Sequence, residues 1–251
     1  MAENNAGRFE GKKFVITGGS GGIGRATAEL LAAEGASVLA TGTNADKLAA
    51  VKGPRIHTLV NDAGSPEAAN ALAAWVREHF GTVDGVFLNA GYGLFVPHDQ
   101  VTAEAFAQQY DVNVRGPILH VAVLSPLLKE GGSVVLNTSI ASEMGMPGGV
   151  LYGSSKAALR NVTRTLAAEL AGRKIRVNAI SPGPVGTDFF ARTGIPEDQA
   201  AQMAQGILAQ VPLGRFGEAV EIARPVAFLL SDDASFITGA ELVADGGMAQ
   251  V

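Results

Sequence analysis

Residues 13–24 read KFVITGGSGGIG and give the strongest indication of the fold. Its first five residues predict a buried strand, and an Ala/Leu-rich segment after the glycines predicts a helix that ends near Glu34. Gly19, Gly21 and Gly24 satisfy the G-x-G-x-x-G pattern between the two elements. In that context glycines allow close approach of a pyrophosphate, whose charge lies against a helix N-terminus. We therefore expect a dinucleotide-binding turn.

Two other glycine-rich motifs compete for the same residues. A phosphate-binding P-loop needs Lys and then Ser or Thr after its last glycine, but Gly24 is followed by Arg25-Ala26. Residues 18–22 also match the G-x-S-x-G elbow of hydrolases, whose mechanism needs a histidine late in the chain. The histidines are His57, His79, His98 and His120. The second half of the chain has none, which disfavours a hydrolase.

Further apolar runs alternate with helical segments along the chain. This alternation predicts one α/β domain over residues 1–251, a doubly wound Rossmann fold with a seven-stranded parallel sheet and helices on both faces. The later strands are expected at 36–41, 56–60, 84–88, 134–136, 175–180 and 240–243, with helical regions at 102–128 and 219–230. Residues 184–216 are either a mobile substrate lid or an ordinary pair of surface helices.

Composition narrows the classes of function. The chain has 251 residues, a net charge of −5 and no basic run, so nucleic acid is not an expected partner. It has no cysteine, which excludes disulfides and thiol catalysis and fits a reducing compartment. No signal-like or membrane-spanning apolar stretch is visible, so a cytoplasmic protein without membrane contact is expected. The histidine and acidic spacings do not match a metal site, and no catalytic metal is expected.

A second informative stretch is Leu151-Tyr152-Gly153-Ser154-Ser155-Lys156. On a helix, Tyr152 and Lys156 leave the same face one turn apart, so the ammonium is expected to lower the pKa of the phenol from about 10. Tyr152 would then serve as a general acid or base. Ser139 follows the apolar strand at 134–136, where its hydroxyl could hold a carbonyl oxygen. A lone Tyr-x-x-x-Lys can also be a chance surface pair.

The end of the second strand bears on the choice of cofactor. An NAD-binding protein usually has an acid there for the ribose hydroxyl, and such an acid would repel a 2′-phosphate. Here residues 40–44 read ATGTN, with no acid before Asp46. NADP(H) is therefore favoured, although NAD(H) is possible because no arginine stands at Gly42 or Thr43. Arg25 and Lys47 are nearby candidates to hold a phosphate.

For two polar residues, Asp62 and Asn113, the sequence allows more than one interpretation. Asp62 could accept a hydrogen bond from an adenine amino group, or it could cap the helix that begins near Pro66. Asn113 is a poor helix former in the middle of a helical region, so it either faces solvent or holds water or backbone.

Together these motifs resemble the short-chain dehydrogenase/reductase superfamily over residues 11–247. Ser139 precedes Tyr152 by 13 residues, which is the spacing of that family's active site. The resemblance implies that Tyr152 exchanges the substrate proton, that Lys156 lowers the pKa of Tyr152 and holds the nicotinamide ribose, that Ser139 orients the substrate oxygen, and that Asn113 supports a water. The implied cofactor-binding residues are Gly18, Ser20, Gly21, Gly22, Ile23, Gly24, Thr43, Asn44, Asp62, Ala63, Asn89, Ala90, Gly91, Tyr152, Lys156, Pro182, Gly183, Val185 and Thr187.

The implied function is reduction of an apolar ketone, or oxidation of a secondary alcohol, with NADP(H). The expected substrate pocket is lined by Leu94, Phe95, Met144, Met146, Pro147, Phe189 and Phe190. One alternative is a 3-oxoacyl-carrier-protein reductase, in which Lys129, Arg173 and Lys174 either receive an acidic carrier protein or are ordinary solvated cations. A non-catalytic dinucleotide sensor or scaffold is the alternative from another class. The resemblance also implies a homotetramer.

Overall fold

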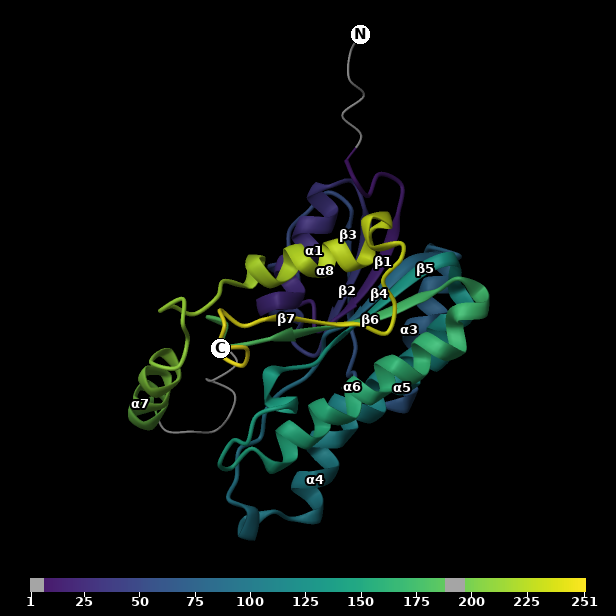
Figure 1. The fold of residues 1–251 in the computed structure, drawn as a ribbon. Helices are drawn as coiled ribbons and strands as arrows, with labels where there is room; N and C mark the ends of the chain where they lie inside the picture. The colour runs from purple at the N-terminus through teal and green to yellow at the C-terminus, as the bar shows by residue number, and fades with distance from the viewer. Residues whose placement is uncertain (1–6, 188–196) are drawn as a thin grey trace.

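A computed structural model describes residues 7–187 and 197–251, with the side chains of 197–201 left out. Phe189 and Phe190 therefore lie outside the described residues. The sheet has seven parallel strands in the order β3-β2-β1-β4-β5-β6-β7 (Figure 1). The strands are β1 (Lys13–Thr17), β2 (Ser37–Gly42), β3 (Ile56–Val60), β4 (Val83–Leu88), β5 (Leu128–Asn137), β6 (Arg176–Pro182) and β7 (Glu241–Ala244). The predicted doubly wound fold is confirmed.

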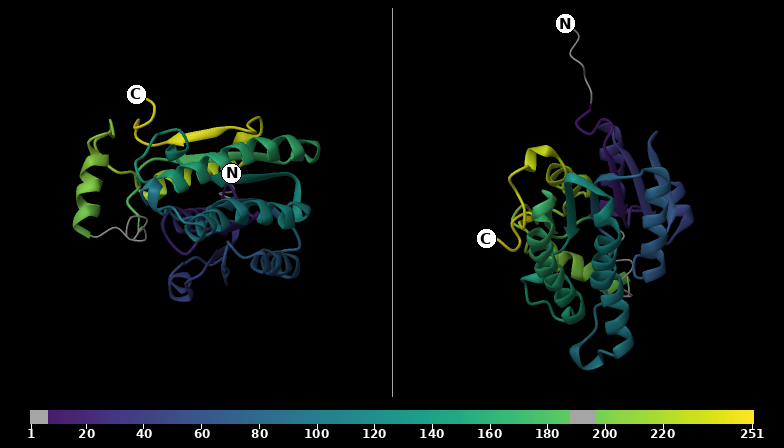
Figure 2. Two further views of the ribbon diagram at one scale, coloured as in Figure 1. Left: turned by 90° about the horizontal axis from the view of Figure 1, so that it is seen from below. Right: turned by 90° about the vertical axis from the view of Figure 1, so that its right-hand side faces the viewer.

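Helices cover both faces of this sheet (Figures 1 and 2). One face is packed by α1 (Gly22–Ala33) and α8 (Ala219–Leu230), and the other by α3 (Pro66–His79), α5 (Gly116–Leu124) and α6 (Val150–Leu170). The remaining α-helices are α2 (Ala45–Ala49), α4 (Ala103–Tyr110) and α7 (Glu197–Leu208). Within the described ranges, no helix has the length and apolar character needed to cross a membrane.

Two hydrophobic cores result from the alternation of side chains along each strand. In β1, Val15 faces the core under α3, α5 and α6, whereas Phe14 and Ile16 face the core under α1 and α8. All three are at most 1% exposed. Burying such a side chain contributes about 1.5–3 kcal/mol, so both faces of the central strands stabilise the fold.

The strand order reverses between β1 and β4. From β1 the chain builds outward to β2 and β3 and then returns to β4 on the other side of β1. A crevice opens at the carboxyl ends of strands at such a point, and it is where open α/β sheets bind ligands. Gly18 and Ala90 meet there, because a Cβ atom on Gly18 would lie 2.9 Å from the Ala90 Cα.

The region 102–128 differs from the continuous helix that was expected. Between α4 and α5 the chain forms a π-helical turn, Asp111–Arg115, and β5 already begins at Leu128. A π turn inserts one extra residue into a helix and often marks a functional site. Here it directs Asn113 into the protein interior, where the side chain is fully buried.

Candidate active site

A cavity of about 800 Å³ lies at the carboxyl ends of β1, β4, β5 and β6. That volume is in the usual range for small-molecule and cofactor sites. Most of the residues that sequence reasoning selected line it. They are Gly18, Ser20, Gly21, Gly22, Ile23, Thr43, Asp62, Ala63, Asn89, Ala90, Gly91, Ser139, Tyr152, Lys156, Pro182, Gly183, Val185 and Thr187.

Three selected residues do not line the cavity but support its walls. Gly24 packs behind the turn, where an added Cβ would lie 2.2 Å from the Gly18 carbonyl oxygen. Asn44 caps α2, and its Oδ1 accepts a hydrogen bond from the Lys47 amide at 2.8 Å. Asn113 is buried beside the catalytic candidates.

The glycine turn has a backbone conformation and close contacts that favour glycine. Gly18 and Gly22 have φ angles of +65° and +50°, a region that disfavours side chains. A Cβ on Gly22 would also lie 3.2 Å from the Thr187 Cγ2. Because α1 begins at Gly22, its N-terminus is directed at the cavity and favours a negatively charged group. The turn therefore fits a pyrophosphate.

Hydrogen bonds join this turn to the two strands beside it. The Asn89 Nδ2 donates to the carbonyl oxygens of Thr17 and Gly18 at 3.2 and 3.1 Å. The Asn89 Oδ1 accepts from the Asn137 Nδ2 at 2.9 Å. Asn137 was not predicted as a functional residue, although its position as the first polar residue after a buried strand run was a usable signal. Its amide and carbonyl groups both hold parts of the site.

The capping interpretation of Asp62 is wrong. The N-cap of α3 is Ser65, which accepts a hydrogen bond from the Ala68 amide. The Asp62 Oδ1 instead accepts from the Gly64 amide at 2.9 Å, which closes a short turn, and the residue lines the cavity. An adenine contact thus remains a prediction for Asp62.

Of the two cations proposed to hold a phosphate at the end of β2, one lines the cavity and the other does not. Lys47 lines the cavity together with Gly42 and Thr43. Arg25 pairs with Glu29 on α1, with 2.8 Å between Nε and Oε1, and does not line the cavity. Of the two, Lys47 is placed to meet a phosphate.

Lys156 is buried, with only 4% of its surface exposed, so the chance surface-pair interpretation is wrong. Its Nζ donates to the Asn137 carbonyl oxygen at 2.7 Å and lies 5.8 Å from the centre of the Tyr152 ring. Burial penalises the ammonium and lowers the pKa of Lys156 to about 8. The side chain can therefore gain and lose a proton near neutrality.

Tyr152 departs from the expected pKa direction. Burial dominates and raises the pKa of Tyr152, while a hydrogen bond with Ser139 acts in the opposite sense. The expectation that Lys156 lowers this pKa is wrong for the structure described, because the phenolate loses more solvation than its neighbours replace. The Phe95 ring contributes to that apolar setting, 5.4 Å from the Tyr152 ring.

The Asn113 side chain hydrogen-bonds to backbone groups, which agrees with one of its two predicted interpretations. The other interpretation, exposure to solvent, is wrong because the side chain is buried. Its Oδ1 accepts from the Tyr92 amide at 3.1 Å, and its Nδ2 donates to the Tyr92 carbonyl at 2.9 Å and the Ser155 Oγ at 3.1 Å. A Cβ on Gly91 would lie 3.1 Å from the Asn113 Oδ1 and 3.4 Å from the Lys156 Nζ. Asn113 and Lys156 thus both lie next to Gly91, at the position that a side chain there would occupy.

Comparison with known proteins agrees with this geometry. Residues 18–249 match a family described as enoyl-(acyl carrier protein) reductase. An uncharacterised oxidoreductase of Methylorubrum extorquens is 38% identical, covering 96% of this chain and 99% of that protein. A 3-oxoacyl-[acyl-carrier-protein] reductase of Escherichia coli is 36% identical, covering 97% and 99%. A short-chain dehydrogenase/reductase of Brucella melitensis, described as a glucose/ribitol dehydrogenase, is 33% identical with a TM-score of 0.90, covering 98% and 99%. The chain belongs to the short-chain dehydrogenase/reductase superfamily. It is an NAD(P)-dependent oxidoreductase.

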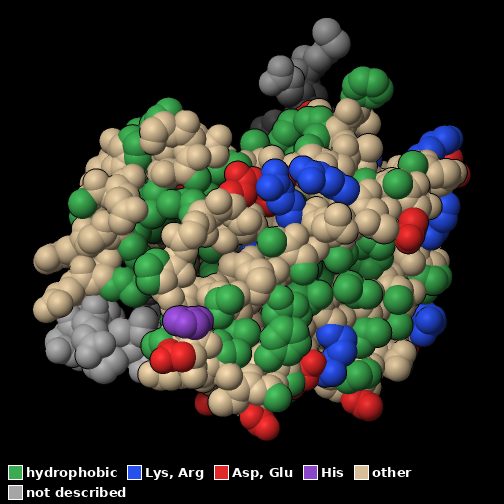
Figure 3. Space-filling view, turned by 60° about the horizontal axis from the view of Figure 1, so that its bottom comes forward, with side chains coloured by type: hydrophobic (Ala, Val, Ile, Leu, Met, Phe, Trp, Pro, Cys, Tyr) green, Lys and Arg blue, Asp and Glu red, His purple; other side chains and the backbone are tan. Residues whose placement is uncertain are grey.

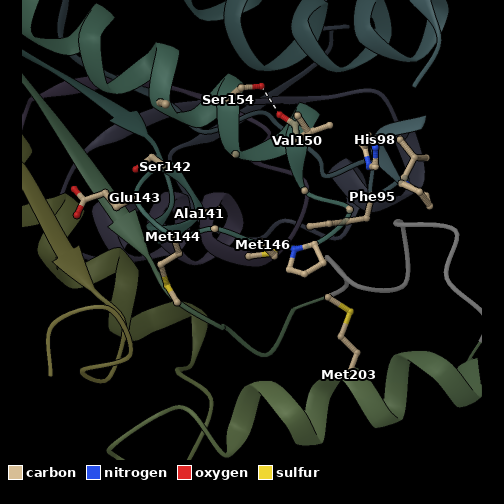
Figure 4. Close-up of a pocket in the computed structure, with 18 residues that line it drawn as sticks. Phe95, His98, Ala141, Ser142, Glu143, Met144, Met146, Val150, Ser154 and Met203 are labelled. Carbon is tan, nitrogen blue, oxygen red and sulfur yellow. Dashed lines mark hydrogen bonds between the residues drawn. The ribbon is translucent and has the colours of Figure 1, made fainter. Parts of the chain in front are cut away.

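This short-chain dehydrogenase/reductase has a second cavity of about 990 Å³ beside the first (Figure 4). Four of the expected substrate-pocket residues, Phe95, Met144, Met146 and Pro147, line both cavities. Leu94 lines neither of them. Met203 on α7 also lines both cavities. It lies in the segment proposed as a substrate lid but was not predicted as a pocket residue, because the sequence does not show how α7 packs.

The cations proposed for a carrier protein lie at the other end of the dehydrogenase/reductase sheet. Lys129 pairs with Asp84 at 2.9 Å, and Lys174 pairs with Glu130 at 2.6 Å. Arg173 donates to the carbonyl oxygens of Ser125 and Leu128, both at 2.7 Å. They sit at the start of β5, whereas Ser139 follows its end. Leu128 and Leu136 of β5 pair with Val83 and Leu88, which are five residues apart on β4. At about 3.3 Å per residue that paired length is roughly 17 Å, and Ser139 lies beyond it.

Proposed function

We propose that this protein is an NADPH-dependent carbonyl reductase that converts an apolar ketone to a secondary alcohol and can run the reverse oxidation. The observation that carries the proposal is the placement of Tyr152, hydrogen-bonded to Ser139 and next to buried Lys156, in the same cavity as the glycine turn. Proton exchange and dinucleotide binding would then occur in one enclosed site.

Each side chain has a separate task in this proposal. The Ser139 hydroxyl holds the substrate oxygen, and the Tyr152 hydroxyl donates its proton to that oxygen during reduction. Lys156 holds the nicotinamide ribose, and Asn113 fixes the backbone of Tyr92 beside it. The nicotinamide, when bound, supplies the hydride to the carbonyl carbon. One hydride and one proton thus convert the carbonyl group into an alcohol.

The end of β2 supports NADPH over NADH. A Cβ at Gly42 would lie 2.7 Å from the Ser20 Oγ, so an acidic side chain does not fit there without movement of Ser20. No carboxylate then repels a 2′-phosphate at this position, and Lys47 lines the cavity beside it. Parallel titrations with NADPH and NADH test this preference, and tighter binding of NADH would contradict it.

Turnover separates the enzyme from the non-catalytic sensor. NADPH oxidation should be measured over a panel of ketones and 3-oxoesters, with cofactor binding followed on the same samples. Consumption of NADPH with any of these substrates supports the reductase. Tight cofactor binding with no turnover across the panel would favour the sensor instead.

A 3-oxoacyl-carrier-protein reductase is a second candidate, favoured by the relative in Escherichia coli. The positions of Lys129, Arg173 and Lys174 do not favour it within one chain, because they lie far from Ser139. A comparison of a 3-oxoacyl-carrier protein with the matching short thioester decides between the two functions. A large preference for the carrier-bound form would establish the carrier-protein reductase.

A homotetramer is part of the proposal by analogy with the family. Hydrophobic side chains gather on the face turned forward in Figure 3, the lower side of Figure 1. On α4 and α5, the apolar side chains of Phe106 and Ile118 are 47% and 42% exposed. Light scattering on the purified protein tests the assembly, and a monomer would contradict it.

A further inference from the structure

All four methionines that follow Met1 line the main cavity. Met144 and Met146 belong to the loop before α6, Met203 to α7 and Met248 to the C-terminal turn. Segments that are far apart in the sequence therefore bring the same unusual residue type to one site. Methionine is unbranched and polarisable, and it adapts its shape to different apolar partners.

Three of these methionines also separate the main cavity from the second one. The residues shared by both cavities are Phe95, Met144, Gly145, Met146, Pro147 and Met203. In Figure 4 the Met203 side chain extends from α7 toward the loop that carries Met144 and Met146. We call Met144, Met146 and Met203 the methionine wall. A substrate held at Tyr152 can place a large group against this wall and toward the second cavity.

The backbone behind the wall is held in place. The Val96 amide donates to the Gly148 carbonyl oxygen at 2.9 Å, and the Gly149 amide donates to the Met146 carbonyl oxygen at 2.9 Å. These bonds fix the loop on both sides of Pro147. Adjustment to substrates of different shape therefore falls to the thioether side chains rather than to the backbone.

The described lining of the second cavity contributes no lysine or arginine to receive an anionic group. Among the described residues that line it, the ionisable side chains are His98 and Glu143. Glu143 is paired with Arg160 at 2.8 Å, and the same Arg160 lies 2.7 Å from Glu241. A substrate carboxylate on the methionine wall would lie against thioether side chains and near the Glu143 carboxylate, with no cation among the described lining residues of this cavity to pair with it.

We infer that the methionine wall makes the enzyme a broad-specificity reductase of uncharged ketones that carry one large apolar group, and that it excludes the corresponding anions. This inference rests on the proposed reductase function. It names a substrate class and three specificity-determining residues, and it predicts tolerance of shape together with intolerance of negative charge.

The charge test compares a ketone bearing a terminal methyl ester with the same ketone bearing a free carboxylate, at pH 7.5. The wild type should prefer the ester at least about tenfold in kcat/KM. Met203→Lys should reduce that preference at least about tenfold, because it places a cation on the wall. Gln205→Lys adds the same charge to α7 at an exposed position outside both cavities and should leave the preference unchanged.

The shape test compares straight-chain, branched and aryl ketones without charge. Their kcat/KM values should fall within about tenfold for the wild type, and the triple variant Met144→Leu, Met146→Leu, Met203→Leu should widen that range at least about fivefold. If the triple variant does not fold, Met203→Leu alone should widen it in the same direction. Equal use of ester and carboxylate by the wild type, or equal effects of Met203→Lys and Gln205→Lys, would overturn the inference.

Calorimetric measurement of binding tests the methionine wall independently of the reductase function. The secondary alcohols that match the ester and the carboxylate are titrated into the NADP⁺-loaded protein. Preferential binding of the ester supports the methionine wall even if no ketone is turned over. Equal binding would overturn it even if turnover is found.

Discussion

Lys129 lies at the start of β5 and Lys156 lies against its far end, and their ammonium groups have different surroundings. The Lys129 Nζ is 2.9 Å from the Asp84 carboxylate, and 45% of its side chain is exposed. The Lys156 Nζ is buried and donates to the Asn137 carbonyl oxygen. A carboxylate compensates the first charge in a solvated setting, whereas a carbonyl dipole and the Tyr152 ring face the second. The difference indicates that the fold tolerates an unfavourable charge where the proposed chemistry uses it.

The largest expected effect is the loss of the Tyr152 hydroxyl. Tyr152→Phe should lower kcat for ketone reduction by about 10³-fold, because proton transfer by a positioned group contributes about 10²–10⁴-fold. Cofactor affinity should change by less than about threefold. Stopped-flow reduction and NADPH titration measure the two quantities.

Tyr110→Phe is the matched control, since the Tyr110 hydroxyl donates to Ser154 on the same helix, two residues from Tyr152. This variant should retain most of the activity. Comparable losses in both variants would assign Tyr152 a structural role rather than a chemical one.

Lys156→Met should abolish most activity and yet stabilise the protein. Lowering the pKa of Lys156 from 10.5 to about 8 corresponds to about 3 kcal/mol against the folded state at neutral pH. The variant also loses the hydrogen bond to Asn137, about 1 kcal/mol. The free energy of unfolding should therefore rise by about 1–2 kcal/mol at pH 7.

The pH dependence distinguishes this explanation from simple repacking. Below pH 8 the lysine is charged in folded and unfolded chains, so the full penalty applies. Between pH 8 and 10.5 the folded protein releases the proton while the unfolded chain retains it, so wild-type stability rises relative to the variant. Urea titrations at pH 7 and pH 10.5 should show the advantage of the variant and then its loss. An advantage that is independent of pH would contradict the charge explanation.

Local patterns predicted the strands and the helix at Ala219–Leu230, because alternation and helical periodicity need only neighbouring residues. They also selected Ser139, Tyr152 and Lys156, which the structure brings together at one cavity. The direction of the Tyr152 pKa was missed, since it depends on how completely tertiary packing buries the phenol. Helical spacing identifies Lys156 as a neighbour of Tyr152, but it does not show how far the phenol is removed from water.

The π turn at Asp111–Arg115 was also outside the reach of sequence patterns. Asn113 occupies it because its amide bonds to Tyr92 and Ser155, which are 21 and 42 residues away in the chain. Contacts of that kind are visible only after folding. The same is true of Met203, whose contribution to both cavities depends on the packing of α7.

A smaller effect is expected at Lys47, which lines the cavity as Lys156 does. Lys47→Met should weaken NADPH binding about five- to tenfold and leave NADH binding within about twofold, because only NADPH carries the 2′-phosphate. Titrations at low salt measure the difference, which should shrink as salt screens the contact. Equal weakening of both cofactors would place Lys47 elsewhere in the binding site.

The smallest effect is expected at Lys129. Lys129→Met should lower the free energy of unfolding by less than about 1 kcal/mol, because exposed ion pairs contribute little. Asp84 keeps other partners, since its Oδ2 accepts from the Lys13 amide at 2.8 Å and its Oδ1 lies 3.9 Å from the Lys12 Nζ. Activity should be unchanged, and the small loss should vanish in 1 M salt. The same substitution thus has opposite signs at the two ends of β5, destabilising at Lys129 and stabilising at Lys156. Equal signs in urea titrations at pH 7 would mean that burial of the ammonium does not distinguish the two ends.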